Sequence, residues 1–419
     1  MATVHVVGAG VAGLACAVRL VRAGQAVALY EAAPHAGGRC RSFFEPALGR
    51  SIDNGNHLLL GANEATMAYL DTVDARDSLY SAPRVVFPFI DLRSGARWTL
   101  RPNPGRLPWW LLARSRRVPD SRLGHYLGAL RLARAGPNAT IADVVDARDP
   151  FFERFWEPLA VAVLNTAAAE ASARLFGRVV ALTFGRGGRA CRAFVTRDGL
   201  SASLVDPALA WLRERGCAPR FGARLRAIGF DGRRAGELDF GDRMERLGDD
   251  DGIVLAVPPA RAAELVPNLT VPRASRAIVN AHFRLSSPAA LPEGSPFVGL
   301  VGGHAQWLFL RGDVASVTVS AADAMLDDDS GELAALLWAD AARALGVAAE
   351  PLPPCRVVKE RRATFAQTPE DVARRPPAET AYRNLFLAGD WTATGLPATI
   401  ESAVLSGHTA ARLVERSRR

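Results

Sequence analysis

Three spaced glycines near the start of the chain have the pattern of a turn that binds phosphates. They lie in the run Gly8-Ala9-Gly10-Val11-Ala12-Gly13. In this pattern Gly8 permits a tight turn, Gly10 lets the backbone approach a pyrophosphate, and Gly13 allows a helix to pack closely on a strand. The free N–H groups at the start of that helix, around Val11 and Ala12, would face the phosphates.

The elements around these glycines must form a βαβ unit to position them. Residues 3–7 and 26–30 are apolar and predict two buried strands, and residues 14–22 have the periodicity of a helix. Glu31 ends the second strand, 18 residues after Gly13, where a carboxylate accepts hydrogen bonds from a ribose. Because all four features agree, we predict a Rossmann-type dinucleotide site rather than a plain glycine turn. The fingerprint alone does not separate NAD from FAD.

Two further stretches favour FAD. Gly37-Gly38-Arg39 follows Glu31 and offers flexible backbone and a guanidinium to a second phosphate, although alone it would be read as an ordinary turn. Near the other end, residues 385–388 predict a buried strand that ends in Gly389-Asp390, and a helix is predicted to follow Ala398-Thr399-Ile400. A strand end followed by a helix start is a second anion site, suited to the ribityl-phosphate part of FAD, and Asp390 is placed to accept from a ribityl hydroxyl.

Composition limits the class of protein. With 419 residues, 49% hydrophobic and 22% charged, the chain is long enough for two globular domains. The net charge of +8 comes almost wholly from arginine, since Lys359 is the only lysine. Acidic residues are mixed in throughout and no basic block has interleaved aromatic residues, so a nucleic-acid partner is not expected.

The cysteines and apolar runs exclude other classes. The five cysteines are far apart and form no CxxC pair, so neither a metal site nor a disulfide framework is expected. No basic region precedes the apolar start, which argues against a signal peptide. The longest apolar run, residues 159–169, is too short to cross a bilayer as a helix. We therefore expect a cytoplasmic protein.

Changes in pattern along the chain predict two interleaved domains. The FAD-binding domain combines residues 1–80, 197–260 and 384–419, and the substrate-binding domain combines a helical insertion at 81–196 with residues 261–383. Outside the βαβ unit we predict helices at 200–215 and 331–345, and strands at 220–230, 235–240, 252–257 and 316–320. The fold class is α/β, a Rossmann-type FAD-binding domain interleaved with a mixed α+β domain.

These motifs resemble the flavin amine oxidase and phytoene desaturase superfamily. Residues 53–61 (DNGNHLLLG), 362–365 (RATF) and 384–402 more specifically resemble the hydroxysqualene dehydroxylases, also called squalene-associated FAD-dependent desaturases. The likeness extends nearly end to end. Asn56 stands where that family would have glutamine.

The resemblance implies a glutathione-reductase-like fold of the amine oxidase type and non-covalent FAD. It implies reductive loss of the hydroxyl of hydroxysqualene, a long apolar isoprenoid, to give squalene in hopanoid biosynthesis. The alternatives are a carotenoid or phytoene-type polyprenoid desaturase, a flavin amine oxidase, and a non-catalytic prenyl-lipid carrier. Because the sequence contains no second nucleotide fingerprint, an unidentified electron donor is also implied.

The same resemblance places the segment Asp53 to His57 beside the flavin. Gly55, Asn56 and His57 are then expected to contact the cofactor. Asp53 and His57 are the candidate acids that protonate the leaving hydroxyl, a contribution of about 10²–10⁴-fold to the rate in general acid catalysis. The alternative for Asp53 is a turn residue before Gly55, and for His57 a hydrogen-bonded packing histidine.

One apolar segment has the composition of a membrane contact. Residues 107–112 (LPWWLL) have Arg106, Arg114, Arg116 and Arg117 as neighbours, and tryptophans beside cations suit an anionic lipid surface. We therefore expect peripheral contact with the inner face of the membrane. The alternative is a core helix with a solvated arginine end.

Overall fold

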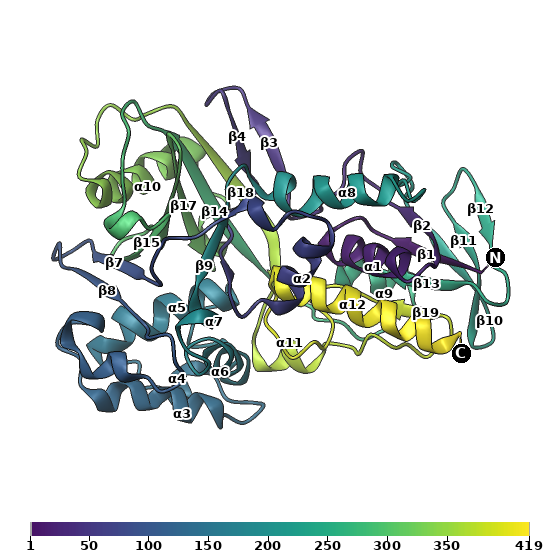
Figure 1. The fold of residues 1–419 in the computed structure, drawn as a ribbon, viewed down its shortest axis with the longest axis horizontal. Helices are drawn as coiled ribbons and strands as arrows, with labels where there is room; N and C mark the ends of the chain where they lie inside the picture. Colours follow the sequence, from purple (N-terminus) through teal and green to yellow (C-terminus); the bar gives the residue numbers. More distant parts are fainter. Residues whose placement is uncertain (1, 419) are drawn as a thin grey trace.

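Four parallel strands from distant parts of the chain form one sheet in the computed structural model, which describes residues 2–418. Their order is β19 (Leu385–Leu387), β13 (Gly252–Leu255), β1 (Thr3–Val7) and β2 (Ala26–Tyr30), and each neighbouring pair is parallel. Every strand comes from the residues that the sequence assigned to the nucleotide domain. The two ends of the chain lie in this same lobe (Figure 1).

The two faces of this sheet are covered by different layers. One face contacts helices, and the other contacts a small helix and an antiparallel sheet. Side chains alternate between the two cores, since Val254 and Phe386 face the helices whereas Ile253 and Leu385 face the antiparallel sheet. The helices are α1 (Val11–Arg22), α2 (Glu64–Thr72), α8 (Asp206–Arg213) and α12 (Ile400–Ser417); the second layer is α9 (Pro259–Leu265) with β10 (Ala227–Asp231), β11 (Arg234–Asp239) and β12 (Met244–Arg246).

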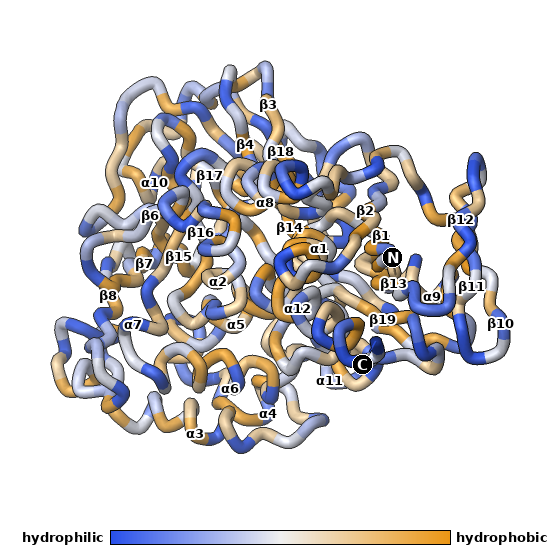
Figure 2. The backbone as a smooth tube through the Cα atoms, turned by 45° about the vertical axis from the view of Figure 1, so that its right-hand side comes forward, coloured by the Kyte–Doolittle hydropathy of each residue, from blue (hydrophilic) through white to orange (hydrophobic). Residues whose placement is uncertain are grey.

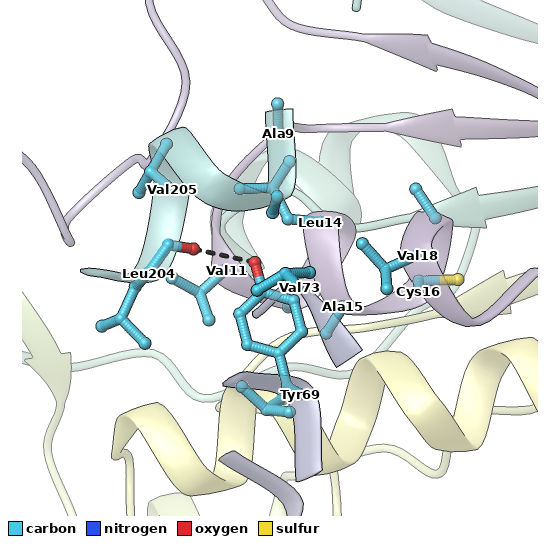
Figure 3. Close-up of a cluster of buried hydrophobic side chains, with 14 of the residues drawn as sticks. Ala9, Val11, Leu14, Ala15, Cys16, Val18, Tyr69, Val73, Leu204 and Val205 are labelled. Atoms are coloured by element: carbon cyan, nitrogen blue, oxygen red, sulfur yellow. Dashed lines mark hydrogen bonds between the residues drawn. The ribbon is translucent and has the colours of Figure 1, made fainter. Parts of the chain in front are cut away.

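A buried cluster joins α1 and α2 to a π-helix at Ser201–Val205 (Figure 3). Within it the Tyr69 hydroxyl donates to the carbonyl oxygen of Leu204 at 2.8 Å. The next residue, Val205, lies against Gly37, where an added Cβ would approach its Cγ2 to 3.0 Å. The cluster therefore fixes the π-helix against the second glycine turn.

The other lobe contains a seven-stranded sheet with two unlike faces. Apolar side chains of its central strands, such as Val279 and Val317, face the long helix α10 (Ser330–Leu345), whereas Asn280 and Thr318 face the opposite way. The only parallel pair is β15 with β7. The strand order is β18 (Cys355–Phe365), β14 (Ser275–Arg284), β17 (Val314–Ser320), β16 (Trp307–Arg311), β15 (Phe297–Val301), β7 (Phe87–Asp91) and β8 (Arg97–Leu100).

A helical insertion lies below this sheet in Figure 1 and has an aromatic core. Its helices are α3 (Gly128–Ala133), α4 (Ile141–Val144), α5 (Glu157–Leu164), α6 (Ala173–Leu182) and α7 (Gly188–Cys191), with a π-helix at Phe152–Trp156. The short elements that remain are β3 (Ser42–Glu45), β4 (Arg50–Asp53), β5 (Leu59–Leu60), β6 (Leu79–Tyr80), β9 (Ala193–Thr196) and α11 (Pro369–Ala373). In Figure 2 the hairpin sheet β10–β12, at the outer edge, has long hydrophilic stretches.

Most predicted elements are confirmed, and two are wrong in detail. The strands predicted at 3–7, 26–30, 235–240, 252–257, 316–320 and 385–388 and the helix at 331–345 are present within a few residues. Residues 220–230 are not one strand, since Arg220 makes only an isolated bridge to Tyr30 and Gly222 turns the chain with a φ of +71° before β10. The helix at 200–215 is divided into a π-helix and α8.

Candidate functional site

The first glycine turn leaves open space in front of a helix N-terminus. Gly8 has a φ of +106°, and a Cβ there would collide with the Ala256 carbonyl oxygen. A Cβ at Gly13 would collide with the carbonyl oxygen of Gly8, so α1 approaches its own turn closely. In contrast, a Cβ at Gly10 meets no atom within 4 Å. Since Gly10 is the N-cap of α1, the N–H groups of the first turn point into this space.

Glu31 is held at the carboxyl end of β2, beside this turn. Its Oε2 accepts from the Ala9 N–H at 2.8 Å and its Oε1 accepts from the Ala33 N–H at 2.8 Å. Each carboxylate oxygen has lone pairs for a further donor. The side chain is therefore oriented for the two hydroxyls of a ribose.

The second glycine turn lies directly over the first. The N–H of Gly37 donates to the Ala9 carbonyl oxygen at 2.9 Å, and a Cβ at Gly38 would lie 3.5 Å from the Cα of Gly10. Gly37 and Gly38 have φ values of +103° and +59°, which glycine adopts without strain. The two turns together border the open space in front of α1.

The C-terminal motif meets these turns from the other side. Arg39 donates from Nη2 to Oδ1 of Asp390 at 2.7 Å and from Nη1 to the Ala363 carbonyl oxygen. The carboxylate of Asp390 raises the pKa of the Arg39 guanidinium. Helix α12 begins after Thr399, whose hydroxyl accepts from the Ser402 N–H at 3.3 Å, and a Cβ at Gly407 would collide with the Ala12 carbonyl oxygen of α1. The C-terminal motif therefore lies beside both glycine turns, as predicted, through Asp390 and through the contact of α12 with α1.

The rest of the predicted C-terminal motif is ordered by hydrogen bonds. The Gly389 N–H donates to the Ser406 hydroxyl at 2.7 Å, and the Ala398 N–H donates to Oε1 of Gln367 at 2.9 Å. Ile400 is buried as the first residue of α12. Ala398, Thr399 and Ile400 therefore form the turn that presents the N-terminus of this helix.

Asp53 has contacts that argue against its predicted role as the acid. Its Oδ2 accepts from Nη1 of Arg311 at 2.6 Å, and its Oδ1 accepts from the Ser42 hydroxyl at 2.6 Å and the Leu200 N–H at 2.8 Å. All three partners donate, and the carboxylate is buried, with 5% of its surface exposed. Both oxygens of this carboxylate are therefore occupied by donors from the protein. These contacts link β4 to Leu200, at the start of the π-helix, and to β16, which favours the structural alternative for Asp53; its role as the acid stays a prediction.

The residues after Asp53 lie on the polar face of the seven-stranded sheet. Asn56 donates from Nδ2 to the Thr318 hydroxyl at 2.9 Å, and that hydroxyl donates to Oδ1 of the buried Asn280 at 2.8 Å. A Cβ at Gly55 would approach Nδ2 of Asn280 to 3.1 Å, so a side chain there would require Asn280 to shift. The Asn56 amide thus connects the segment after β4 to β17 of the seven-stranded sheet.

His57 keeps one ring nitrogen free. Its Nδ1 donates to the Gly55 carbonyl oxygen at 2.9 Å, which leaves Nε2 without a hydrogen bond to any residue in 2–418. Burial lowers the pKa of His57, and the bond to Gly55 partly opposes this. The ring is therefore neutral at neutral pH, and its protonated form is a stronger acid than free imidazole.

Sequence reasoning missed a buried arginine behind the C-terminal motif. Arg375 donates to the carbonyl oxygens of Asp390 at 3.0 Å and Leu396 at 2.7 Å and to the Thr394 hydroxyl at 3.1 Å. Burial lowers the pKa of Arg375 to about 10, and no carboxylate pairs with it within residues 2–418. It fixes the loop between β19 and α12, but nothing in its local sequence, Ala-Arg-Arg-Pro-Pro, distinguishes it.

Comparison with known proteins identifies the family. The family model described as flavin containing amine oxidoreductase matches residues 11–415. The chain belongs to this family. It is 48% identical over 413 residues to a hydroxysqualene dehydroxylase of Rhodopseudomonas palustris, covering 98% of each chain. Proteins of the same name from Sinorhizobium fredii and Zymomonas mobilis are 45% and 41% identical over at least 97% of each chain.

Solved structures agree on the fold. Cyclohexylamine oxidase from Brevibacterium oxydans has a TM-score of 0.72 at 18% identity, with all of both chains covered. Putrescine oxidase bound to putrescine has a TM-score of 0.70 at 18% identity, covering 99% of each chain. At these identities the likeness shows the fold alone, which is the α/β fold of the FAD-binding amine oxidases. The predicted fold class is confirmed.

The cofactor of this flavoprotein oxidoreductase is FAD, and the residues present fit it. The open space before Gly10 would accept a pyrophosphate, and Glu31 would accept from a ribose. Asp390 would accept a hydrogen bond from a ribityl hydroxyl, and the start of α12 would face the ribityl phosphate and the flavin end. Within residues 2–418, no helix is long and apolar enough to cross a membrane.

Proposed function

We propose that this protein removes the hydroxyl of hydroxysqualene reductively to form squalene. The observation that carries the proposal is the identity of 41–48% to three proteins named hydroxysqualene dehydroxylase over nearly their full lengths. Both halves of the FAD site that the chemistry requires are present, from Gly8 to Asp390.

The overall reaction needs a hydride and a proton. When bound, reduced FAD supplies the hydride, so that a C–H bond forms as the C–OH bond breaks and the hydroxyl leaves as water. The chain must supply or relay the proton. Of the two candidates, His57 is favoured, because its Nε2 is free whereas the Asp53 carboxylate has three donors around it.

The reducing equivalents would come from a separate electron donor. The one dinucleotide fingerprint, at Gly8 to Gly13, is used by FAD, and Gly185-Arg186-Gly187-Gly188 lacks both the spacing and a preceding strand. In the structure this second run joins α6 to α7.

The test is a single turnover under anaerobic conditions. The FAD-loaded protein is photoreduced and mixed with hydroxysqualene, and flavin reoxidation and squalene are both followed. We expect one squalene for each flavin reoxidised. Reoxidation without squalene, or no reoxidation, would refute the proposal.

The competing activities have their own readouts in the same preparation. A polyprenoid desaturase would convert phytoene with oxidised flavin, and a prenyl-lipid carrier would take up no FAD. An amine oxidase would release peroxide from amines. Its usual lysine near the flavin has no counterpart here, because Lys359 donates to the carbonyl oxygens of Leu326 and Asp328 in a surface loop.

A further inference from the structure

Exposed apolar side chains gather in one short part of the helical insertion. Leu107, Trp109 and Leu112 expose 62–63% of their surface, which is unusual for residues of this size. Further along the same segment, the exposed fractions of three leucines are 48–54%; these are Leu123, Leu127 and Leu130. We call these six side chains the apolar surface. They make up half of the large hydrophobic residues exposed in residues 2–418.

The backbone that presents the apolar surface is held in place. Asn103 donates from Nδ2 to the Leu107 carbonyl oxygen at 2.8 Å and accepts from the Trp110 N–H at 3.2 Å. Trp110 is 4% exposed, and its ring stacks on Phe184 with the centroids 6.1 Å apart. The two adjacent tryptophans therefore have opposite roles. Trp110 anchors the 3-10 helix Trp109–Leu112, and only Trp109 points outward.

The segment around the apolar surface has a large excess of unpaired positive charge. Residues 106–134 contain seven arginines and one acidic residue, Asp120. None of these arginines is within ion-pair distance of a carboxylate in residues 2–418, although many arginines elsewhere are. The seven are Arg106, Arg114, Arg116, Arg117, Arg122, Arg131 and Arg134.

A cavity of about 470 Å³ lies beside the loop that carries the apolar surface, and its lining includes Arg116 and four further arginines. Arg101 pairs there with Glu293 at 2.6 Å, and Arg192 donates to the Ala82 carbonyl oxygen. The others, Arg84, Arg116 and Arg189, have no carboxylate within ion-pair distance in residues 2–418. The Gly188 N–H donates to the Asn103 carbonyl oxygen at 2.7 Å, so the cavity and the 103–112 loop share one framework.

We propose that the apolar surface inserts into an anionic phospholipid bilayer, with lipid phosphates bound by the surrounding arginines and the arginine-lined cavity. Exposed apolar side chains and unpaired cations in one segment match the two layers of a bilayer surface, acyl chains within and phosphates outside. The consequence for catalysis rests on the proposed function, because an isoprenoid substrate would then be taken directly from the bilayer.

The test is flotation of the FAD-loaded protein with phosphatidylcholine vesicles, with and without phosphatidylglycerol. We expect binding to the anionic vesicles that is lost at high salt. The variant Leu107→Ser/Trp109→Ser/Leu112→Ser should bind on the order of 10-fold more weakly or worse. Its control, Leu336→Ser/Val347→Ser/Leu352→Ser, removes apolar residues that are 38–46% exposed elsewhere and should bind as the unmodified protein does.

The charge is tested by Arg106→Gln/Arg114→Gln/Arg116→Gln. At about 1 kcal/mol for each cation near an anionic surface, these changes should weaken binding on the order of 100-fold. Both variants should keep their FAD absorbance and melting temperature. Equal binding to neutral and anionic vesicles, or no binding to either, would overturn the proposal. So would a dimer in analytical ultracentrifugation that the Leu107→Ser/Trp109→Ser/Leu112→Ser variant abolishes.

Delivery of the substrate is measured separately from the chemistry. The apolar variant should raise KM for hydroxysqualene in anionic vesicles and leave turnover of detergent-dispersed substrate unchanged. If hydroxysqualene is converted neither in vesicles nor in detergent, the proposed function fails. Flotation still tests whether the apolar surface binds the bilayer.

Discussion

The guanidinium of Arg39 and the carboxylate of Asp390 form an ion pair at 2.7 Å, although 351 residues separate them in sequence. This pair closes the cofactor site between the second glycine turn and the end of β19. It is also the most direct physical link between the two sequence motifs on which the FAD prediction was based.

Loss of this pair should weaken FAD binding more than it weakens the fold. The Arg39 side chain is 45% exposed, so solvent screens the pair and its contribution to stability is small. We expect Arg39→Ala to raise the Kd for FAD about tenfold, because Asp390 loses the group that orients it. Fluorescence titration of the apoprotein measures this. Arg50→Ala, which breaks a similarly exposed pair with Asp313, is the control, and an equal loss of affinity there would contradict the interpretation.

The glycines of the first turn should separate cofactor binding from folding. A side chain at Gly10 enters open space, so Gly10→Val should leave the apoprotein melting temperature unchanged and abolish FAD binding. Gly8→Ala forces a Cβ into the Ala256 carbonyl oxygen at a φ of +106° and should destabilise the apoprotein by about 2 kcal/mol or more. Gly236→Val, also in open space but in the hairpin sheet, should affect neither property.

Replacement of Asp53 should affect stability and not chemistry. Asp53→Asn weakens a partly buried pair with Arg311 and should lower the free energy of unfolding by about 1–3 kcal/mol. The single-turnover rate of the folded, FAD-loaded variant should remain within a few-fold of normal. A loss on the order of 100-fold or more in that rate, with the flavin spectrum unchanged, would restore Asp53 as the acid.

The role proposed for His57 predicts a limb in the pH profile on which the single-turnover rate falls with rising pH. If its imidazolium protonates the leaving hydroxyl, the single-turnover rate should fall as the pH rises through the pKa of His57. Because burial lowers that pKa below 6.5, the fall begins below pH 6.5. His57→Gln should reduce the rate about 10²–10⁴-fold and remove this limb. His125→Gln, which changes a partly exposed histidine beside Asp149, should retain it.

His282 should make the fold sensitive to acid. Burial lowers its pKa to about 4, so the unfolded chain takes up a proton below pH 6.5 while the folded chain does not. Stability is therefore full above pH 6.5 and is lost as the pH falls toward 4, by about 3 kcal/mol from this group. In urea denaturation, His282→Asn should lose less stability between pH 7 and pH 4.5 than the unmodified protein. An identical loss would show that other groups dominate.

The parts of the site that the sequence predicted depend on short-range patterns. The spacing from Gly8 to Glu31 fits within one βαβ unit, and Gly389-Asp390 directly follows its strand, so each motif could be recognised without knowing its partners. The motifs did not show which of their residues contact one another in the folded protein. The sequence contains no local signal for the pair between Arg39 and Asp390.

The parts that the sequence did not predict depend on long-range register. Asp53 was a candidate acid through the family resemblance alone, and its partner Arg311, 258 residues away, cannot be inferred from the sequence. The hydrogen bonds of Asn56 to Thr318 and of Thr318 to Asn280 require the pairing of β14 with β17. Trp109 and Trp110 are indistinguishable by composition, and a 3-10 helix of four residues has too few turns for periodicity to show which one is buried.

The order of strands in the parallel sheet also determines when during synthesis all residues of the predicted cofactor site are present. Translation produces β1 first, but its neighbour β13 emerges only after residue 255, and β19 and the start of α12 after residue 400. A chain that has not yet reached residue 390 therefore lacks the part of the predicted cofactor site that Asp390 and α12 supply.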